Sequence, residues 1–278
     1  MMKKHTVLYS IIILLLFFCF PEVIISCSTS YYFRTLGIND GLSQSTVNAI
    51  LQDQKGFMWI GTKDGLNQYD GQECRVFQKE NSSLGNNFIT VLYEDCEGYI
   101  WVGTDAGVYI YNPVQEAFQF LDTEIASSGE KITRAVTWIT SDSQNNIWIS
   151  VDNQGLFCYN RGKKNLTKVV SCGKSGIANV THFWFYAGQL WIARYEDNLY
   201  VSKDNSSFNA FNDVDGEDIF KGLVINSYVE GLHNCLYVGT SKGLMEINLT
   251  SRKVRKLLDE YVRDICFRSD TDLWIVYL

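Results

Sequence analysis

The sequence predicts an all-β fold that is built from repeats. The segment Asp53–Leu66 returns with the same pattern of residue types at Asp95–Val108, and the central tryptophans of the two copies lie 42 residues apart. Aromatic residues then recur at steps of 47, 43, 46 and 37 residues. The six aromatic positions are Trp59, Trp101, Trp148, Trp191, Tyr237 and Trp274. A period of about 40–45 residues with short strands is typical of a β-propeller blade, so we predict a propeller of about six repeats.

The first repeat predicts one four-stranded blade. Its apolar and alternating segments are the expected strands, 47–52, 57–62, 66–69 and 74–78. Asp53 and Gly56 bound a predicted type I turn, because Asp favours the first position of that turn and Gly the last. Asp64-Gly65 predicts a tight hairpin, and Asp70-Gly71 predicts the next turn. Four antiparallel strands joined in this order form a meander.

The strand around Trp59 is apolar on both faces, from Phe57 to Ile60. A sheet with one face in water would alternate apolar and polar residues. An inner propeller strand is covered on both faces by neighbouring blades, which explains the continuous apolar run. We therefore expect the repeated tryptophans to fill the space between blades as structural residues, with stacking on sugars as the alternative role.

The repeat pattern weakens along the chain. In the third repeat Asn145 stands where the first two have glycine, and Asn tolerates left-handed backbone geometry. The sixth repeat ends at Leu278, within its second predicted strand. Tyr31–Leu36 has the composition of a strand and is a candidate outer strand of a final blade. We expect an incomplete ring with a truncated last repeat, in a chain that is part of a longer protein.

Composition restricts the classes of partner. Of the 278 residues, 46% are hydrophobic and 14% are aromatic, with only two prolines, which favours a folded domain over disorder. The net charge is −7, and the basic residues form no large cluster. Because phosphate binding needs clustered Lys and Arg, we do not expect nucleic acid or anionic membrane surfaces as partners.

Six cysteines follow residue 27, and we expect them to be buried free thiols. They occur about once per repeat at unlike positions, which argues against a disulfide framework. The nearest pair, Cys158 and Cys172, flanks a turn that sets Cys158 opposite about Thr167. No CxxC motif occurs, so a zinc site would lack ligands at usable spacing. The sequence predicts no metal site and no cofactor.

Residues 1–27 predict an export signal, and residues 28–278 form the predicted propeller. Two lysines precede an apolar stretch at 11–20 that is too short for a comfortable membrane span. Ile24 to Cys27 resembles a bacterial lipobox, which makes Cys27 the candidate lipidation site and N-terminal membrane anchor. An ordinary cleaved signal peptide and an uncleaved signal anchor are the alternatives. All three place the propeller outside the cytoplasm, in the periplasm or facing it.

The segment Asn39–Ile50 reads NDGLSQSTVNAI and runs into a D-x-x-G-x-x-W-I-G-T-x-x-G-L-x-x-Y-D block at 53–70. Together they closely resemble the two-component regulator propeller repeat, over Tyr31–Leu278 and most strongly in the first two repeats. The resemblance implies the periplasmic sensor region of a hybrid two-component histidine kinase, in which propellers bind fragments of complex polysaccharides. It therefore implies an oligosaccharide ligand and, in the intact protein, a membrane helix and a downstream kinase module. Neither His182 nor His233 lies in a kinase phospho-acceptor motif.

The fourth repeat carries the candidate ligand-binding residues, Arg194, Tyr195 and Glu196. They replace the Thr-x-x-Gly connection between the second and third strands. That connection is expected on the same face of the propeller as the blade-to-blade loops. A departure from a structural consensus can mark function, and Arg beside Tyr suits an acidic or a neutral sugar. Drift in a weak repeat is the alternative explanation.

No catalytic constellation is evident, so we do not expect an enzyme. Most carboxylates fall in predicted turns, where Asp satisfies backbone amides. The acidic segment 213–218 lacks the spacing of an EF-hand calcium loop. A stand-alone surface or periplasmic propeller for binding or interaction is the alternative function, and a propeller glycosidase or lyase is less favoured. The oligomeric state, a homodimer included, is left open.

The lipobox resemblance generates a first prediction. Growth with a labelled fatty acid should tag the mature protein, and Cys27→Ser should abolish the label, because acylation requires the thiol of that cysteine. The label is measured on the purified protein after electrophoresis. Labelling that survives the substitution would contradict lipidation at Cys27.

Overall fold

The computed structural model describes residues 34–169, 180–186, 188–202, 204, 207–269 and 272–277. Contacts divide the chain into two units, Met1–Thr35 and Leu36–Leu278, and all the described strands belong to the second unit. The predicted export signal and its Cys27 lie outside the described residues. Among the residues that are described, no helix is long and apolar enough to cross a membrane.

The described chain forms six antiparallel sheets, five with four strands and one with two. The first three sheets are β1 (Val47–Gln52), β2 (Met58–Thr62), β3 (Gly65–Tyr69) and β4 (Cys74–Phe77); β5 (Ile89–Glu94), β6 (Ile100–Thr104), β7 (Gly107–Asn112) and β8 (Ala117–Phe120); and β9 (Val136–Ser141), β10 (Ile147–Val151), β11 (Gly155–Asn160) and β12 (Asn165–Lys168). The next three are β13 (Val180–Tyr186), β14 (Gln189–Arg194), β15 (Leu199–Ser202) and β16 (Asn209–Ala210); β17 (Ile225–Glu230), β18 (Cys235–Thr240), β19 (Gly243–Asn248) and β20 (Lys253–Leu258); and β21 (Val262–Phe267) and β22 (Leu273–Tyr277). A short 3-10 helix, η1 (Ile38–Asp40), precedes β1.

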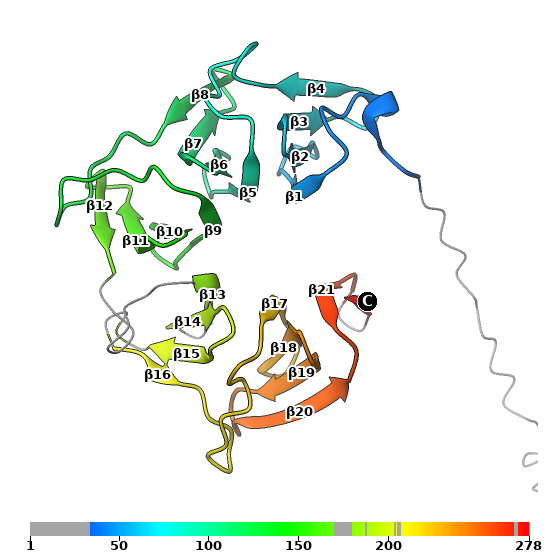
Figure 1. The fold of residues 1–278 in the computed structure, drawn as a ribbon, viewed down its shortest axis with the longest axis vertical. Coiled ribbons are helices and arrows are strands. Elements are labelled where there is room, and N and C mark those ends of the chain that lie inside the picture. The colour runs from blue at the N-terminus through cyan, green and yellow to red at the C-terminus, as the bar shows by residue number, and fades with distance from the viewer. Residues whose placement is uncertain are drawn as a thin grey trace, which may run out of the picture. The chain divides into compact units, whose positions relative to one another are not determined.

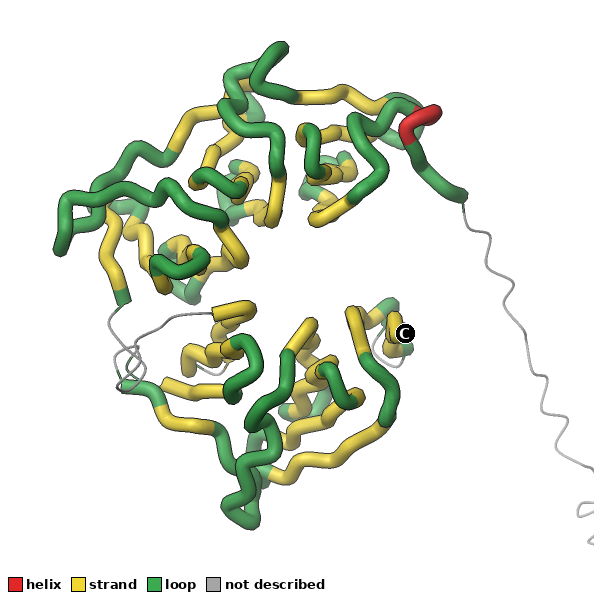
Figure 2. Tube along the Cα trace, in the orientation of Figure 1, coloured by secondary structure: helices red, strands yellow, loops and turns green. Residues whose placement is uncertain are grey.

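The sheets are the blades of a propeller, arranged around a common axis (Figure 1). The first strand of each blade lies nearest the axis, and successive first strands contact one another from β1 to β21. The fourth strand of each complete blade lies on the outside. Short turns join most strands within a blade, and longer loops lead from β4 to β5, from β8 to β9 and from β16 to β17 (Figure 2). The ring is not closed, so the prediction of an incomplete propeller of four-stranded blades is confirmed.

A hydrogen-bonded pair, which we call the Asp–Trp clasp, recurs in the first three blades. The indole Nε1 of Trp59 donates to Asp53 Oδ2 at 2.8 Å. Asp53 Oδ1 accepts the backbone N–H groups of Lys55 and Phe57 at 3.0 and 2.9 Å. The same pattern joins Trp101 to Asp95 at 2.7 Å and Trp148 to Asp142 at 2.9 Å. One carboxylate therefore closes the turn between the first two strands and also fixes the tryptophan.

The clasped tryptophans pack between blades. Trp59 is only 1% exposed, and its ring lies 5.9 Å from that of Phe77 and 4.9 Å from that of Tyr111 in the next blade. Trp101 contributes in the same way to a core cluster that includes Ile139 and Ile149 of the third blade. The structural role expected for these tryptophans agrees with this packing, because each indole is buried against two neighbouring sheets.

Two details of the weaker repeats also agree with the sequence. Asn145 has a φ of 61°, the left-handed geometry expected of a residue in the place of glycine. Cys158 lies opposite Thr167 in the β11–β12 ladder. The register is therefore the one that the turn between those strands predicts.

The sixth blade differs from the others. Trp274 is 38% exposed, so the expectation that every repeated aromatic fills the space between blades is wrong for this residue. The physical reason is that no described strand packs beyond β22. Val276 and Tyr277 on the same strand are 55% and 60% exposed. Arg34–Leu36, the described end of the candidate closing strand, has no strand structure, and the rest of that segment lies outside the described residues.

The described cysteines are free thiols, but none is fully buried. Cys96 and Cys266 are exposed, and Cys74, Cys158 and Cys235 are partly buried. The expectation of buried thiols is therefore wrong for the five described cysteines, because they lie in turns or at the edges of inter-blade packing. Cys172 lies outside the described residues.

The packing of the clasped tryptophans generates a second prediction. Trp101→Ala should lower the free energy of unfolding by about 3–5 kcal/mol, because it leaves a cavity between two blades. Trp274→Ala is the matched control and should cost under about 2 kcal/mol, because much of that side chain already contacts water. Urea unfolding followed by circular dichroism measures both. A Trp101→Ala variant as stable as the control would contradict the structural role.

Candidate functional site

Every innermost strand carries one extra residue near its start. In each blade the pairing with the second strand skips one position, which is a β-bulge. The six bulge residues are Asn48, Thr90, Thr137, Thr181, Asn226 and Arg263. Bulges redirect side chains and are frequent beside functional sites. All six residues line one cavity on the propeller axis.

Several bulge residues tie one blade to the next. Asn48 Nδ2 donates to the carbonyl of Ile89 at 2.8 Å, and Asn226 Nδ2 donates to that of Val262 at 2.7 Å. Thr137 Oγ1 donates to Val180 O at 3.2 Å. In each case the acceptor is the residue before the next bulge. Uncharged polar side chains therefore link three of the five pairs of successive inner strands: β1 to β5, β9 to β13 and β17 to β21.

The axial cavity has a volume of about 750 Å³. Its wall contains the six bulge residues together with Trp138, His182 and Tyr228. The ring of Trp138 lies 4.7 Å from that of His182 and 6.3 Å from that of Tyr228. Three adjacent blades thus place aromatic rings beside amide and hydroxyl groups in the same cavity.

Four polar atoms of residues in the cavity wall are buried without a hydrogen-bond partner. They are Thr90 Oγ1, Trp138 Nε1, His182 Nδ1 and Ser227 Oγ. Buried polar groups in native proteins are nearly always paired with protein, water or ligand. Ser227 Oγ packs against Gly239 of β18, and the other three atoms leave unused hydrogen-bonding capacity in the cavity wall.

Burial sets the charge state of the ionisable groups around the cavity. It lowers the pKa of His182 to about 4, although the carbonyl of Ile225 acts in the opposite direction. Burial raises the pKa of Tyr228, and the nearby carboxylate of Glu230 adds to the effect. Burial also raises the pKa of Glu230. At neutral pH both the His182 imidazole and the Tyr228 phenol are uncharged.

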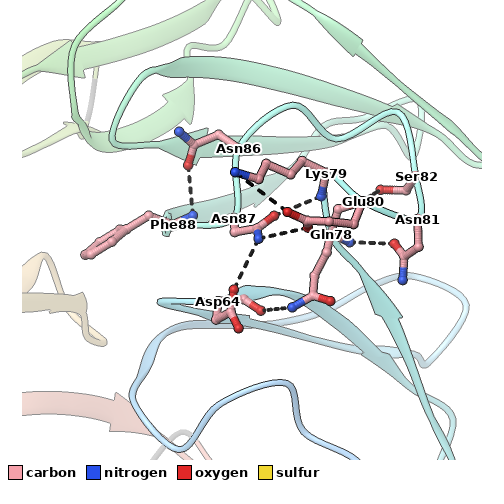
Figure 3. Close-up of polar contacts among 9 residues, drawn as sticks. All are labelled: Asp64, Gln78, Lys79, Glu80, Asn81, Ser82, Asn86, Asn87 and Phe88. Atoms are coloured by element: carbon pink, nitrogen blue, oxygen red, sulfur yellow. Dashed lines mark hydrogen bonds and ion pairs between the residues drawn. The ribbon is translucent and has the colours of Figure 1, made fainter.

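Polar contacts at one end of the ring join a blade-to-blade loop to the β2–β3 turn (Figure 3). Asn87 Nδ2 donates to Asp64 Oδ1 at 3.1 Å, and Gln78 Nε2 donates to the backbone oxygen of Asp64 at 2.8 Å. The backbone oxygen of Asn87 also accepts the N–H of Gly65 at 2.7 Å. The two kinds of connection therefore lie on the same face, as the sequence predicts. The inner-strand bulges begin at this face, directly after the blade-to-blade loops.

The β14–β15 turn on this face contains the sequence-predicted residues Arg194, Tyr195 and Glu196. They lie outside the cavity wall. Arg194 pairs with Val180 in the β-ladder, one strand outward from the bulge at Thr181. Its guanidinium forms an ion pair with Asp197 at 2.8 Å and lies over the ring of Tyr200.

The other two residues of the turn are more accessible. Tyr195 is 53% exposed, and Glu196 is exposed with a φ of 48°. Ligand contact by the three residues stays a prediction, with Tyr195 and Glu196 presented to solvent and Arg194 held within the turn.

The acidic segment at 213–218 is a turn held by its own aspartate. Asp213 Oδ1 accepts the backbone N–H groups of Asp215 and Glu217 at 3.0 and 2.8 Å. Among the described residues, no group of three or more His, Cys, Asp or Glu side chains is placed to hold a metal ion.

The bulge residues were missed in the sequence, although a signal is present. Each follows a Val or Ile and is itself Asn, Thr or Arg, at the start of an inner strand. The six dipeptides are Val47-Asn48, Ile89-Thr90, Val136-Thr137, Val180-Thr181, Ile225-Asn226 and Val262-Arg263. In five of the six repeats the bulge residue lies 11 residues before the repeated aromatic, and in the fourth it lies 10 residues before Trp191.

Comparison with known proteins agrees with this architecture. The two-component regulator propeller family matches residues 41–64 and 83–106. Histidine kinase P4 of Formosa agariphila is 41% identical over 51 residues, which is 18% of this chain and 4% of that protein.

Two solved structures share the fold. The extracellular domain of the putative hybrid two-component system BT3049 from B. thetaiotaomicron superposes with a TM-score of 0.73 at 27% identity, over 89% of this chain and 34% of that one. PorZ, a surface component of the type-IX secretion system of Porphyromonas gingivalis, superposes with a TM-score of 0.64 at 15% identity, over 86% of this chain and 40% of that one. The chain thus spans about a third of the BT3049 domain. It is a β-propeller in which two segments match the two-component regulator propeller repeat.

Proposed function

We propose that this chain is the sensing propeller of a hybrid two-component system and that it binds an oligosaccharide in the axial cavity. The observation that carries the proposal is the cavity wall itself, where polar bulge residues surround the axis beside the unpartnered Thr90 Oγ1, Trp138 Nε1 and His182 Nδ1. The likeness to the extracellular domain of a hybrid two-component system supports the sensor role and a location outside the cytoplasm.

The chemistry of the cavity favours a polyhydroxylated ligand. Asn and Thr side chains both donate and accept hydrogen bonds, as sugar hydroxyls require. Trp138 and Tyr228 supply apolar ring surface beside them. Charged residues in the wall are few, among them Glu230, Arg263 and Asp264. The volume of about 750 Å³ lies within the range of small-molecule sites.

The turn at Arg194–Glu196 extends this proposed site toward the rim. It lies on the face where the inner-strand bulges begin, one strand outward from Thr181. A ligand longer than the cavity would pass over this turn, where Tyr195 offers an exposed ring. In this arrangement the cavity holds one sugar unit, and the turn contacts the remainder of the chain.

Binding outside the membrane can signal only when the two sides of the membrane are physically joined. We therefore include a membrane helix and a kinase module downstream in the intact protein, which the match to a histidine kinase supports. The chain itself is proposed to bind and not to catalyse. A stand-alone surface propeller is the second candidate, and the likeness to a surface component of a secretion system favours it.

The oligosaccharide proposal gives a third prediction. In a panel of neutral and acidic oligosaccharides, at least one should raise the melting temperature of the purified chain, because a ligand that binds the folded state stabilises it. Thr90→Val should weaken binding by about tenfold while leaving the melting temperature of the free protein nearly unchanged, because it removes one unpartnered polar atom. Calorimetric titration measures the affinities.

Thr250→Val is the matched control, because Thr250 is exposed and lies in the β19–β20 turn outside the cavity. Binding that is unchanged in Thr90→Val and lost in Tyr195→Ala would move the site to the turn. Absence of binding across the panel would contradict the proposal. Cleavage of a glycan by the wild type that is lost on substitution of Arg194 or Glu196 would establish an enzyme instead.

The low pKa of His182 gives a fourth prediction. The folded pKa of about 4 lies below the ordinary value of 6.5, so the unfolded chain binds this proton more tightly. The neutral imidazole makes its full contribution to the free energy of unfolding above about pH 6.5. That free energy falls by about 2–3 kcal/mol as the pH is lowered toward 4. Urea unfolding at a series of pH values should show this loss in the wild type and a smaller loss in His182→Gln. His233→Gln, at an exposed position, should behave as the wild type; an unaltered pH dependence in His182→Gln would refute the assignment.

A further inference from the structure

The fourth blade keeps the tryptophan of the Asp–Trp clasp but has lost the aspartate. In the first three blades the carboxylate lies six residues before the tryptophan, and that position before Trp191 is Phe185. The turn is also one residue shorter, since Trp184 pairs with Trp191 where Leu51 pairs with Trp59. As a result Trp191 Nε1 is buried without a hydrogen-bond partner, in a side chain that is 3% exposed.

The fifth blade shows the alternative outcome when the aspartate is lost. There Gly231 replaces the aspartate and Tyr237 replaces the tryptophan. A Cβ atom on Gly231 would lie 2.5 Å from the ring of Tyr237, so the tyrosine ring occupies the place of the missing carboxylate. Its hydroxyl donates to Glu246 Oε1 at 3.1 Å. Donor and acceptor have changed together in that blade, whereas the fourth blade retains an indole N–H with nothing to receive it.

The unpartnered indole lies in the wall of a groove between the fourth and fifth blades. The groove has a volume of about 410 Å³. Its polar lining consists of Gln189, Asp204, Ser207, Asn209 and Arg252. The corresponding groove between the first and second blades is lined by both Trp59 and Asp53. The indole N–H that a protein carboxylate accepts in one groove therefore has no protein acceptor in the other.

We propose that this groove binds the carboxylate of a sugar acid, with Trp191 Nε1 and Arg252 as the donors. The guanidinium of Arg252 lies 5.0 Å from the centre of the Phe211 ring, and its Nε and Nη2 donate to Asn212 O at 3.1 and 2.8 Å. These contacts fix the plane of the guanidinium and use only part of its five N–H donors. A charge-assisted bond to a carboxylate is the strongest use of such a donor.

The remaining lining favours hydroxyl groups and a single carboxylate in the part of the ligand that enters the groove. Asp204 accepts hydrogen bonds from Ser202 Oγ at 2.9 Å and from the N–H of Ser207 at 2.8 Å, so its carboxylate is held within the groove. A second anionic group inside the groove would be repelled by it. Asn209 and Gln189 provide amides for hydroxyl groups. The groove thus suits a uronic acid, free or at one position of an oligosaccharide, and it is separate from the axial cavity.

The test is titration of the full chain with D-glucuronate, with D-glucose as the matched neutral sugar and with a linear trigalacturonate. Indole N–H resonances of the ¹⁵N-labelled protein provide the measurement. An acid, but not glucose, should shift the Trp191 resonance, and Trp191→Phe and Arg252→Gln should each weaken binding by about tenfold or more. Trp148→Phe is the matched control, because that indole already donates to Asp142, and it should bind as the wild type does.

The same experiment distinguishes the two sources of the ligand, a free sugar acid and an acidic oligosaccharide. Binding of glucuronate identifies a site for a free sugar acid, and binding of trigalacturonate alone identifies a subsite for an acidic oligosaccharide; both support the proposal. Absence of a Trp191 shift with either acid, or equal affinity for acid and glucose, overturns it. Retained affinity in Arg252→Gln also overturns it, without relying on the fold of the tryptophan variant. Thr90→Val should leave binding of the acid in the groove unchanged, because Thr90 lies in the wall of the axial cavity. The test of the groove is therefore independent of the proposed axial site.

Discussion

The hydrogen bond between a turn aspartate and a buried indole is the interaction on which the first three blades of this propeller depend. Each blade must close the turn between its first two strands. It must also hold the large side chain of its second strand against the next blade. One carboxylate meets both, with Oδ1 on the backbone of the turn and Oδ2 on the tryptophan in three blades. In the second blade Arg161 adds an inter-blade ion pair to Asp95 at 2.9 Å. The first three blades are therefore joined where their turns meet.

At the axis the blades are joined by different means. The inner-strand bulges turn Asn48, Thr137 and Asn226 toward the carbonyls of the next blade, so cohesion there comes from uncharged hydrogen bonds. This arrangement leaves a central cavity whose wall is polar without being strongly charged. A ligand in that cavity would contact strands from several blades at once. Binding would thereby change the relation between blades, which is the kind of change that a sensor domain can transmit.

Much of the fold could be predicted from the sequence, because its determinants are local. Asp53, Gly56 and Trp59 recur at fixed spacing, and the turns and strands follow from them. The exposure of Trp274 could not be predicted, because burial depends on whether another sheet packs against it. The axial cavity was also missed, because a bulge appears only when two strands are paired, and a residue such as Thr90 looks like any other strand threonine.

The proposed turn residues Arg194–Glu196 were selected because they break the repeat, but the Arg194–Asp197 ion pair depends on folding of the turn. The groove beside Trp191 required comparison of hydrogen-bond partners among blades.

The central claim is that the bulged inner strands form the ligand site of a sensor propeller. The most direct measurement is a crystal structure of the chain with an oligosaccharide bound. The account predicts that a sugar unit lies on the axis, with hydroxyl groups within hydrogen-bond distance of Thr90 Oγ1 and of other bulge side chains. An oligosaccharide bound only on the outer face of the blades, with the axial cavity holding water alone, would contradict it.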